Sequence, residues 1–279
     1  MAETSQRRRL GSRQPDPSMT DAQRYSMLGK NRLMNKMNII GKKIGPETRI
    51  YRIFPRDRFL QLFQEDQNAL VLPTLWDDPF ENAILKAEVR TSTGELGSFS
   101  FHGDVYGQCW TLETASDAMW QIYSRNSDAV RVRTTVGRLI ESLSASQGDW
   151  AHVSCFIGRV DYMSEKRLRE FGSTVFKGGV TPEAVARSLL AKRRAYKHEN
   201  EVRLIYFERS DNKHPKGVFK YALEPRKVID QVMVDGRVSY NDFLPLKKKI
   251  MKLTGFSDQQ VRRSLLYRPP DNFVVELSF

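Results

Sequence analysis

The sequence contains little cysteine: its 279 residues include only Cys109 and Cys155. The two are far apart, and neither belongs to a CxxC motif or to a cluster of cysteine and histidine. A disulfide framework needs several paired cysteines, and a structural zinc site needs a close tetrahedral set of ligands. The pattern therefore excludes both as the basis of the fold, and we expect two buried thiols.

Long apolar runs are also missing. No window approaches the roughly 20 apolar residues that a membrane helix needs, and no apolar signal-peptide core follows the arginines near the N-terminus. We find no internal repeat. With 40% hydrophobic and 28% charged residues the composition is that of a globular protein, and we expect a cytoplasmic location without a membrane partner.

Acidic residues are outnumbered, since 45 Lys and Arg oppose 33 Asp and Glu and give a net charge of +12. Residues 1–49 hold eleven of the basic and four of the acidic residues, so this segment carries +7 and the other 230 residues only +5. Such an excess indicates a polyanionic partner, namely RNA, DNA or a nucleic-acid-associated protein. A leader that only keeps the protein soluble is the alternative.

Composition divides the chain into two parts. Residues 1–43 form a basic flexible leader, which ends in a short basic helix expected from residue 20 to about residue 43. Residues 44–279 alternate strand-like and helical segments, which predicts a single α+β domain.

Residues 106–134 hold the densest pattern. They read as a strand at 106–111, a helix capped by Ser116, and a second strand at 129–134 that alternates apolar and basic residues. One face of the helix carries Met119, Trp120 and Tyr123. Ordinary core packing explains aromatic residues in such a unit, and a binding surface is the alternative.

The later part of the chain predicts a helix followed by a central strand. Thr181 and Pro182 are typical of a helix start, and the helix is expected to run from residue 183 to about residue 196 with Lys192 facing outward. The segment HENEVRLIYFE, residues 198–208, carries apolar residues on both faces and is expected to lie inside a sheet.

The acidic segment LWDDPFEN, residues 75–82, allows two interpretations. Asp78 can cap a helix that begins at Pro79, with Glu81 in its first turn. Alternatively, Asp77, Asp78 and Glu81 could bind a metal, but vicinal acids without a matching Lys or His partner are a weak signal. We assign no metal ligand.

Five segments together resemble the domain-of-unknown-function 2971 family, over about residues 48–240. They are WDDPFEN (76–82), CWT (109–111), SDAMWQIYS (116–124), AVRVRT (129–134) and HENEVR (198–203). The order of these parts is similar to that of ADP-ribosyltransferases, which implies a mixed or split sheet around an NAD cleft. The first strand lacks the histidine of that superfamily and the second lacks its Ser-Thr-Ser triad, so the match is to the order of the elements.

The resemblance implies a site drawn from three strands. Its catalytic residues would be Arg52, Thr111 and Glu201, and its NAD-binding residues Tyr51, Trp110, Trp120, Tyr123 and Arg203. In such a site Glu201 stabilises the oxocarbenium character of the departing ribose, Arg52 holds pyrophosphate or ribose, and aromatic rings stack on nicotinamide. A structural ion pair with Arg203 or Arg52 is the alternative role for Glu201.

An NAD-dependent ADP-ribosyltransferase that modifies nucleic acid or a nucleic-acid-bound protein is thus the leading hypothesis, with a toxin or phage-defence effector as its biological class. A metal-dependent nuclease would instead use the acids Asp77, Asp78, Glu81, Glu199 and Glu201 with Lys192 or Lys197 nearby. A non-catalytic nucleic-acid-binding module would stack bases on aromatic strands. Convergence of Arg52, Thr111 and Glu201 on one cleft would favour the first, whereas a Trp120 buried away from Glu201 would weaken it.

Overall fold

The fold is described from a computed structural model, which places residues 38–76, 78, 81–90, 93–210, 214–270 and 274–277. Most of the expected leader lies outside these residues, as does Asp77. The main compact unit begins at Asn38, earlier than the predicted start at residue 44. The reason is that β1 (Ile39–Ile40) pairs with a strand of the main sheet.

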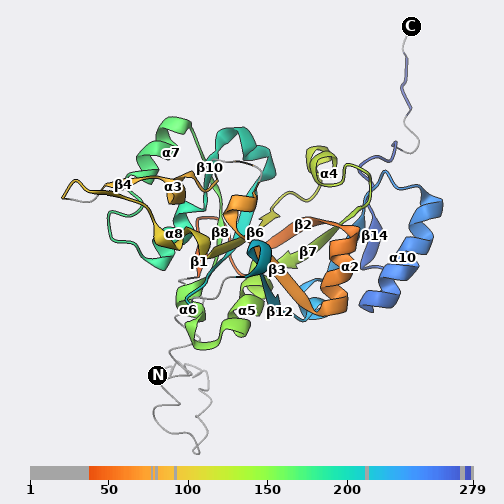
Figure 1. The fold of residues 1–279 in the computed structure, drawn as a ribbon. Coiled ribbons are helices and arrows are strands. Elements are labelled where there is room, and N and C mark those ends of the chain that lie inside the picture. Colours follow the sequence, from red (N-terminus) through yellow and green to blue (C-terminus); the bar gives the residue numbers. More distant parts are fainter. Residues whose placement is uncertain are drawn as a thin grey trace, which may run out of the picture. The chain divides into compact units, whose positions relative to one another are not determined.

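One mixed sheet forms the centre of the unit that begins at Asn38 (Figure 1). Its strands follow the order β1-β8-β11-β6-β2-β7-β13-β14; in addition β3 pairs with β6, and β12 pairs with β3. Beyond β1, their bounds are β2 Arg49–Pro55, β3 Gln67–Val71, β6 Val105–Thr111, β7 Ala129–Thr135, β8 Cys155–Arg159, β11 Glu201–Phe207, β12 Val218–Ala222, β13 Gln231–Val234 and β14 Val261–Arg263. The end strands β1 and β14 pair in parallel and the other pairs are antiparallel, which confirms the predicted α+β fold with a mixed sheet.

The remaining elements surround this sheet. The α-helices are α2 Arg56–Glu65, α3 Ala83–Lys86, α4 Asp117–Tyr123, α5 Val136–Gln147, α6 Ala151–Ser154, α7 Glu165–Gly172, α8 Pro182–Ser188, α9 Pro225–Val228 and α10 Tyr240–Thr254. The 3-10 helices are η1 Pro73–Leu75, η2 Ser100–Gly103, η3 Gly148–Trp150, η4 Arg194–Glu199 and η5 Pro215–Gly217. Two small ribbons pair β4 Val89–Arg90 with β5 Leu96–Gly97, and β9 Asp161–Met163 with β10 Ala191–Arg193.

The sheet splits between β2 and β6. Of the described residues of these two strands, only Tyr51 and Thr111 pair, whereas β2 pairs with β7 along its full length and β6 with β11 likewise. The two halves of the sheet therefore separate beyond one point of contact. This geometry is the split sheet that the resemblance to ADP-ribosyltransferases implied.

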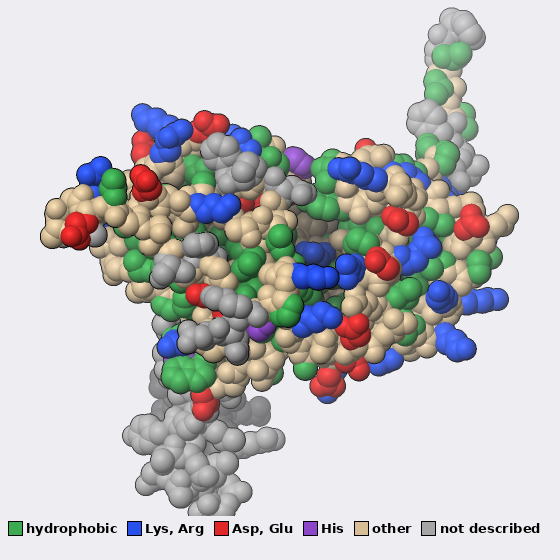
Figure 2. Space-filling model, viewed as in Figure 1, with side chains coloured by type: hydrophobic (Ala, Val, Ile, Leu, Met, Phe, Trp, Pro, Cys, Tyr) green, Lys and Arg blue, Asp and Glu red, His purple; other side chains and the backbone are tan. Residues whose placement is uncertain are grey.

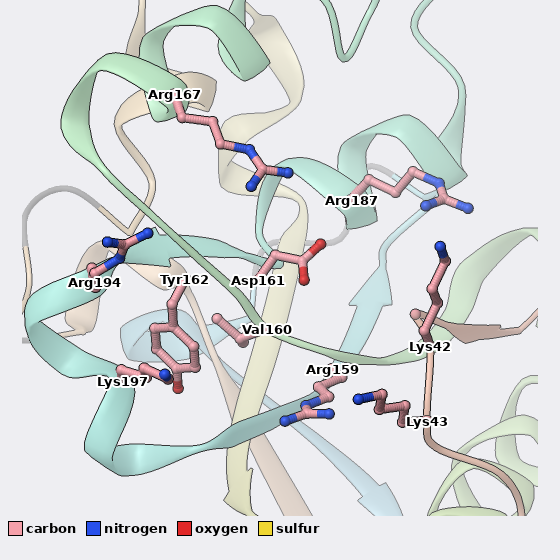
Figure 3. Close-up of a pocket in the computed structure, with 11 residues that line it drawn as sticks. Lys42, Lys43, Arg159, Val160, Asp161, Tyr162, Arg167, Arg187, Arg194 and Lys197 are labelled. Atoms are coloured by element: carbon pink, nitrogen blue, oxygen red, sulfur yellow. The ribbon is translucent and has the colours of Figure 1, made fainter.

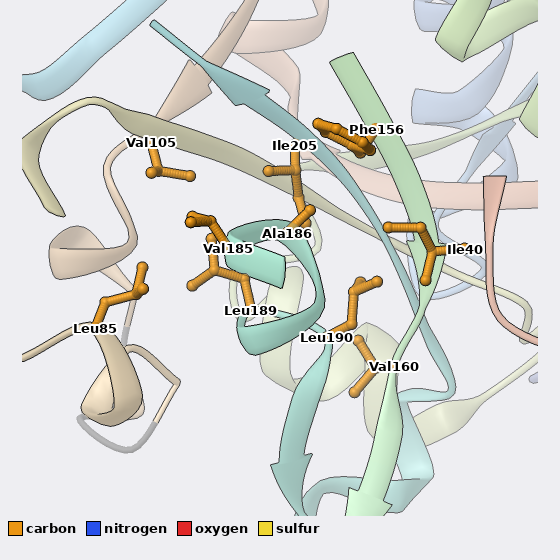
Figure 4. Close-up of a cluster of buried hydrophobic side chains, with 10 residues drawn as sticks. All are labelled: Ile40, Leu85, Val105, Phe156, Val160, Val185, Ala186, Leu189, Leu190 and Ile205. Carbon is orange, nitrogen blue, oxygen red and sulfur yellow. The ribbon is translucent and has the colours of Figure 1, made fainter. Parts of the chain in front are cut away.

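The half of the sheet that carries β8, β11 and β6 is covered by α8. Val185 of this helix and Leu189, which follows its last residue, are buried against Phe156 of β8 and Ile205 of β11 (Figure 4). The hydroxyl of Thr181 accepts a hydrogen bond from the Ala184 N–H and caps α8 as predicted. Side-chain capping by Ser116 likewise starts α4.

One predicted helix is shorter than the sequence indicated. It was expected to reach about residue 196, but α8 ends at Ser188 and the chain continues as β10 and η4. Lys192, predicted to face outward, is only 5% exposed. The helical spacing of the basic residues predicted that the lysine would be exposed. It is buried because distant carboxylates, described below, neutralise its ammonium group.

Candidate functional site

A cavity of about 380 Å³ lies where the sheet splits. Its walls come from residues 51–53 of β2, residues 107–111 of β6, the helix α4 and the segment from β10 to the start of β11. Figure 2 shows a hollow near the middle of the face that it draws, with Lys and Arg side chains beside it. The volume falls within the range of small-molecule sites, about 300–1,000 Å³.

Six of the eight predicted site residues line this cavity: Tyr51, Arg52, Trp110, Thr111, Tyr123 and Glu201. Strand register brings three of them together, because Thr111 pairs with Tyr51 on one side and with Glu201 on the other. Paired residues on neighbouring strands project to the same face of a sheet. Tyr51, Thr111 and Glu201 therefore form a row across β2, β6 and β11.

Arg52 bridges the split. Its guanidinium donates a hydrogen bond to the Cys109 carbonyl of β6 and lies 5.0 Å from the centre of the Phe54 ring. Burial lowers the pKa of Arg52, although nearby groups such as Tyr123 and Glu201 favour its charge. The buried Nε has no hydrogen-bond partner among the described residues. An unpaired buried donor costs about 1–3 kcal/mol, which an oxygen atom of a ligand or a water could recover.

The hydroxyl of Thr111 forms two hydrogen bonds within the protein. It donates to the Glu199 carbonyl oxygen at 2.6 Å and accepts from the Glu113 N–H at 3.0 Å. Trp110 is similarly fixed, because its Nε1 donates to Gln108 Oε1 at 2.8 Å and its side chain is buried. These residues shape the cavity and fix the start of β11 beside β6.

A buried charge network forms one wall. Lys192 Nζ lies 2.6 Å from Glu81 Oε1 and 2.6 Å from Glu201 Oε1, and it also contacts Glu199. Arg203 Nε lies 2.8 Å from Glu201 Oε2. Burial opposes ionisation of Glu201, but Arg203 and Lys192 outweigh it and hold the pKa of Glu201 well below its usual range. Glu201 is therefore a fixed carboxylate, and its ion pair with Arg203 is the structural role that the sequence left open.

The pKa of Glu199 is shifted in the opposite direction from that of Glu201. Burial and the neighbouring Glu201 raise its pKa to about 7, although Lys192 opposes the rise. The hydroxyl of Tyr123, on α4, donates to Glu199 Oε1 at 3.3 Å. Glu199 can thus gain or lose a proton near neutral pH at the cavity wall, which is the property of a general acid or base.

Trp120 and Arg203 were predicted to contact NAD, and the structure corrects both assignments. Trp120 is 2% exposed and packs with Ile53, Met119 and Ala129 beneath α4, so it belongs to the core. Arg203 is fully buried behind Glu201, where it also donates to the Leu189 carbonyl and stacks on the Trp76 ring at 4.5 Å. Neither residue is on the cavity wall.

Several cavity residues were not assigned to an NAD site from the sequence, chiefly Glu81, Lys192, Tyr196, His198 and Glu199. The spacing of Glu199 and Glu201 two residues apart was the available signal for the second carboxylate. No local signal identifies Lys192, because its partners come from three separate positions.

Of the predicted thiols, Cys155 is buried but Cys109 is half-buried and lines the cavity, where burial raises its pKa and keeps it a thiol.

The acidic segment before α3 joins this network. Asp78 Oδ1 lies 2.8 Å from Arg193 Nη2, and Glu81 contacts Lys192. Within the described part of the chain, no group of three or more His, Cys, Asp or Glu residues is arranged to hold a metal. The Lys192 ammonium lies where the carboxylates of Glu81, Glu199 and Glu201 meet, and so it takes the position that a cation would need.

None of the described helices combines the length and hydropathy that a membrane span requires.

Comparison with known protein families and with curated proteins finds no match, which leaves the resemblance to the domain-of-unknown-function 2971 family without support. Among solved structures, the chain is similar to DarT from Thermus sp. 2.9. The complex with ADP-ribosylated ssDNA has 10% identity and a TM-score of 0.37, over 81% of this chain and 98% of that chain. The complex with NAD+ has 12% identity and a TM-score of 0.36, over 80% and 98%. At these TM-scores the likeness is too distant to assign an activity.

Proposed function

We propose that this protein is an NAD-dependent ADP-ribosyltransferase that modifies nucleic acid or a nucleic-acid-bound protein. The observation that carries the proposal is the row of Tyr51, Thr111 and Glu201 at the split of the sheet, with Arg52 beside it. A cytoplasmic location and a role as a toxin or phage-defence effector are parts of the same proposal.

The cavity has groups that fit the nicotinamide and ribose half of NAD. The unpaired Nε of Arg52 can donate to a ribose or phosphate oxygen. Tyr51 and Tyr123 supply aromatic surface on the wall. NAD supplies a bond between ribose and nicotinamide whose cleavage develops positive charge on the sugar.

Glu201 is suited to stabilise that charge because it stays ionised. Each of its carboxylate oxygens accepts one charged donor in the structure, Lys192 or Arg203. A carboxylate offers about four lone-pair positions, so a ribose hydroxyl can still bind. Preorganised negative charge of this kind acts on the transition state without reorganisation.

Glu199 would take the proton of the acceptor. Its raised pKa leaves it partly ionised near neutral pH, and the Tyr123 hydroxyl orients its carboxylate. As the acceptor attacks the ribose, its proton would pass to Glu199, and nicotinamide would leave as a neutral base. A metal-dependent nuclease is disfavoured because Lys192 lies between the carboxylates that would bind the metal.

Labelled NAD tests the proposal directly. The purified full chain is incubated with labelled NAD and with either cellular nucleic acid or cellular protein, and transferred label is counted. We expect transfer by the wild type, a loss of about 100-fold or more in Glu201→Gln and in Glu199→Gln, and no change in Glu224→Gln, which alters an exposed carboxylate. Circular dichroism checks the fold of each variant. Absence of both NAD binding and transfer in the wild type would overturn the proposal.

A further inference from the structure

A second hollow lies beside the cavity and carries positive charge. Its volume is about 840 Å³, and seven cationic side chains line it: Lys42, Lys43, Arg159, Arg167, Arg187, Arg194 and Lys197. We call this hollow the basic cleft. Asp161 is the one acidic residue among the described residues that line it.

Most of this charge is not neutralised. Arg187 pairs with Glu183 at 2.7 Å, and Arg159 donates to the neutral amide oxygen of Asn200. The other five cations, Lys42, Lys43, Arg167, Arg194 and Lys197, form no ion pair with any of the residues that the structure describes. A concave surface lined by one sign of charge focuses the field and attracts ions of the other sign. The cleft is therefore suited to an anion with several charges.

The cations are spread out. They come from the segment after β1, the end of β8, the helices α7 and α8, and η4. Figure 3 shows the charged ends of Arg167, Arg187, Arg194 and Lys42 around Asp161, without convergence on one point. A single phosphate would be held by converging donors, whereas successive phosphates of a chain require donors at intervals.

A shared helix and a hydrogen bond connect the cleft to the cavity. The short helix η4 carries Arg194 and Lys197, which line the cleft, and Tyr196 and Glu199, which line the cavity. The hydroxyl of Tyr162, a residue of the cleft, accepts a hydrogen bond from the Glu201 N–H at 2.9 Å. The basic cleft and the cavity therefore share η4 and are joined by the hydrogen bond between Tyr162 and Glu201.

We propose that the basic cleft binds the phosphate backbone of a single-stranded nucleic acid and presents one of its nucleotides to the cavity. A single strand is favoured because a base within a duplex is stacked and cannot enter a cavity without being flipped out. Backbone binding is argued from the cleft alone, whereas presentation to the cavity rests on the proposed function.

Salt-dependent binding tests the proposal with the full chain, so that the N-terminal basic residues are present in every variant. Fluorescence anisotropy follows binding of a labelled single-stranded oligonucleotide, as DNA and as RNA, at several salt concentrations. The test variant is Lys42→Ala/Arg167→Ala, which removes two exposed cations from different sides of the cleft. The matched control is Lys248→Ala/Lys249→Ala, which removes two exposed cations from α10.

The cleft variant is expected to bind at least about 10-fold more weakly than the control. Loss of two phosphate contacts should also reduce the slope of log K against log salt by about 1.4. Equal affinity and equal slope in the two variants would overturn the proposal. Saturable binding of inorganic tripolyphosphate by a chain that does not bind the oligonucleotide would overturn it as well, because the cleft would then hold a small polyphosphate.

NAD binding by the wild type is measured in parallel. If the oligonucleotide binds in the cleft but NAD does not bind, backbone binding is supported and the proposed function fails. If NAD binds and the cleft variant behaves like the control, the cleft proposal fails and the proposed function stands.

Discussion

Lys192 Nζ lies 2.6 Å from Glu201 Oε1, and each of the two side chains is only 5% exposed. A buried pair of this kind stabilises a fold only if its remaining hydrogen-bond positions are also filled. Here Glu81 and Glu199 complete the surroundings of the lysine, and Arg203 completes those of Glu201. The pair therefore couples the stability of the sheet to the charge of the cavity.

Removal of the lysine should be costly. Lys192→Met leaves three carboxylates close together without their shared cation, and we expect the free energy of unfolding to fall by about 3–5 kcal/mol. Urea denaturation measures the change. The matched control is Lys220→Met, which breaks an exposed pair with Glu65 and should cost about 0–1 kcal/mol. Similar losses in both variants would contradict a central role for Lys192.

The raised pKa of Glu199 predicts a pH dependence of stability. Burial and Glu201 raise this pKa from 4.5 to about 7, so between these values the folded protein holds a proton that the unfolded chain releases. The contribution of Glu199 is therefore full below pH 4.5 and is lost as pH rises toward 7. The free energy of unfolding of wild type minus that of Glu199→Gln should fall across this interval. A difference that stays constant from pH 4.5 to 7 would show that Glu199 is not shifted upward.

Local patterns predicted the elements around the cavity well. The strand at 106–111, the helix capped by Ser116 and the strand at 129–134 correspond to β6, α4 and β7; each of the two strands is one residue longer than predicted. These predictions rest on alternation and capping, which depend on neighbours in sequence. The placement of Tyr51, Thr111 and Glu201 in one row required strand order, which came from the resemblance.

The charge network could not be predicted in the same way. Lys192 follows a helical pattern of basic residues, and only its three-dimensional contacts with Glu81, Glu199 and Glu201 explain its burial. Trp120 shows the converse error, since its position on a helix face fits a binding shelf as well as it fits the core. In both cases the sequence gives the chemistry of the side chain and leaves its neighbours undetermined.

Arg52 spans the split between β2 and β6, and its substitution tests whether it contacts NAD. Arg52→Lys keeps the positive charge but loses the planar fork that reaches the Cys109 carbonyl, together with Nε. We expect the Kd for NAD to rise about 10-fold or more, as for the loss of a charge-assisted hydrogen bond. Isothermal titration calorimetry measures the affinity. Arg138→Lys, which changes an exposed partner of Asp230, is the control and should bind NAD like the wild type. Unchanged affinity in Arg52→Lys would exclude Arg52 from the NAD site.

A side chain at position 107 is expected to disturb the site through the ring of Trp76. A Cβ atom at this position would lie 2.6 Å from a ring carbon of Trp76, and the Trp76 ring stacks under Arg203, which holds Glu201. Gly107→Ala should therefore displace the indole, lower the free energy of unfolding by about 1–3 kcal/mol and reduce label transfer from NAD. Gly97→Ala is the matched control, because no atom lies within 4 Å of its added Cβ.

The double variant Gly107→Ala/Trp76→Leu separates strain from other causes. A smaller side chain at residue 76 leaves room for the new methyl group, so the cost of Gly107→Ala should be smaller in the Trp76→Leu background than in the wild type. Label transfer should stay low in the double variant, because the ring that stacks on Arg203 is gone. Additive costs in this cycle would mean that Gly107 and Trp76 act independently, and that the glycine is not required for the ring.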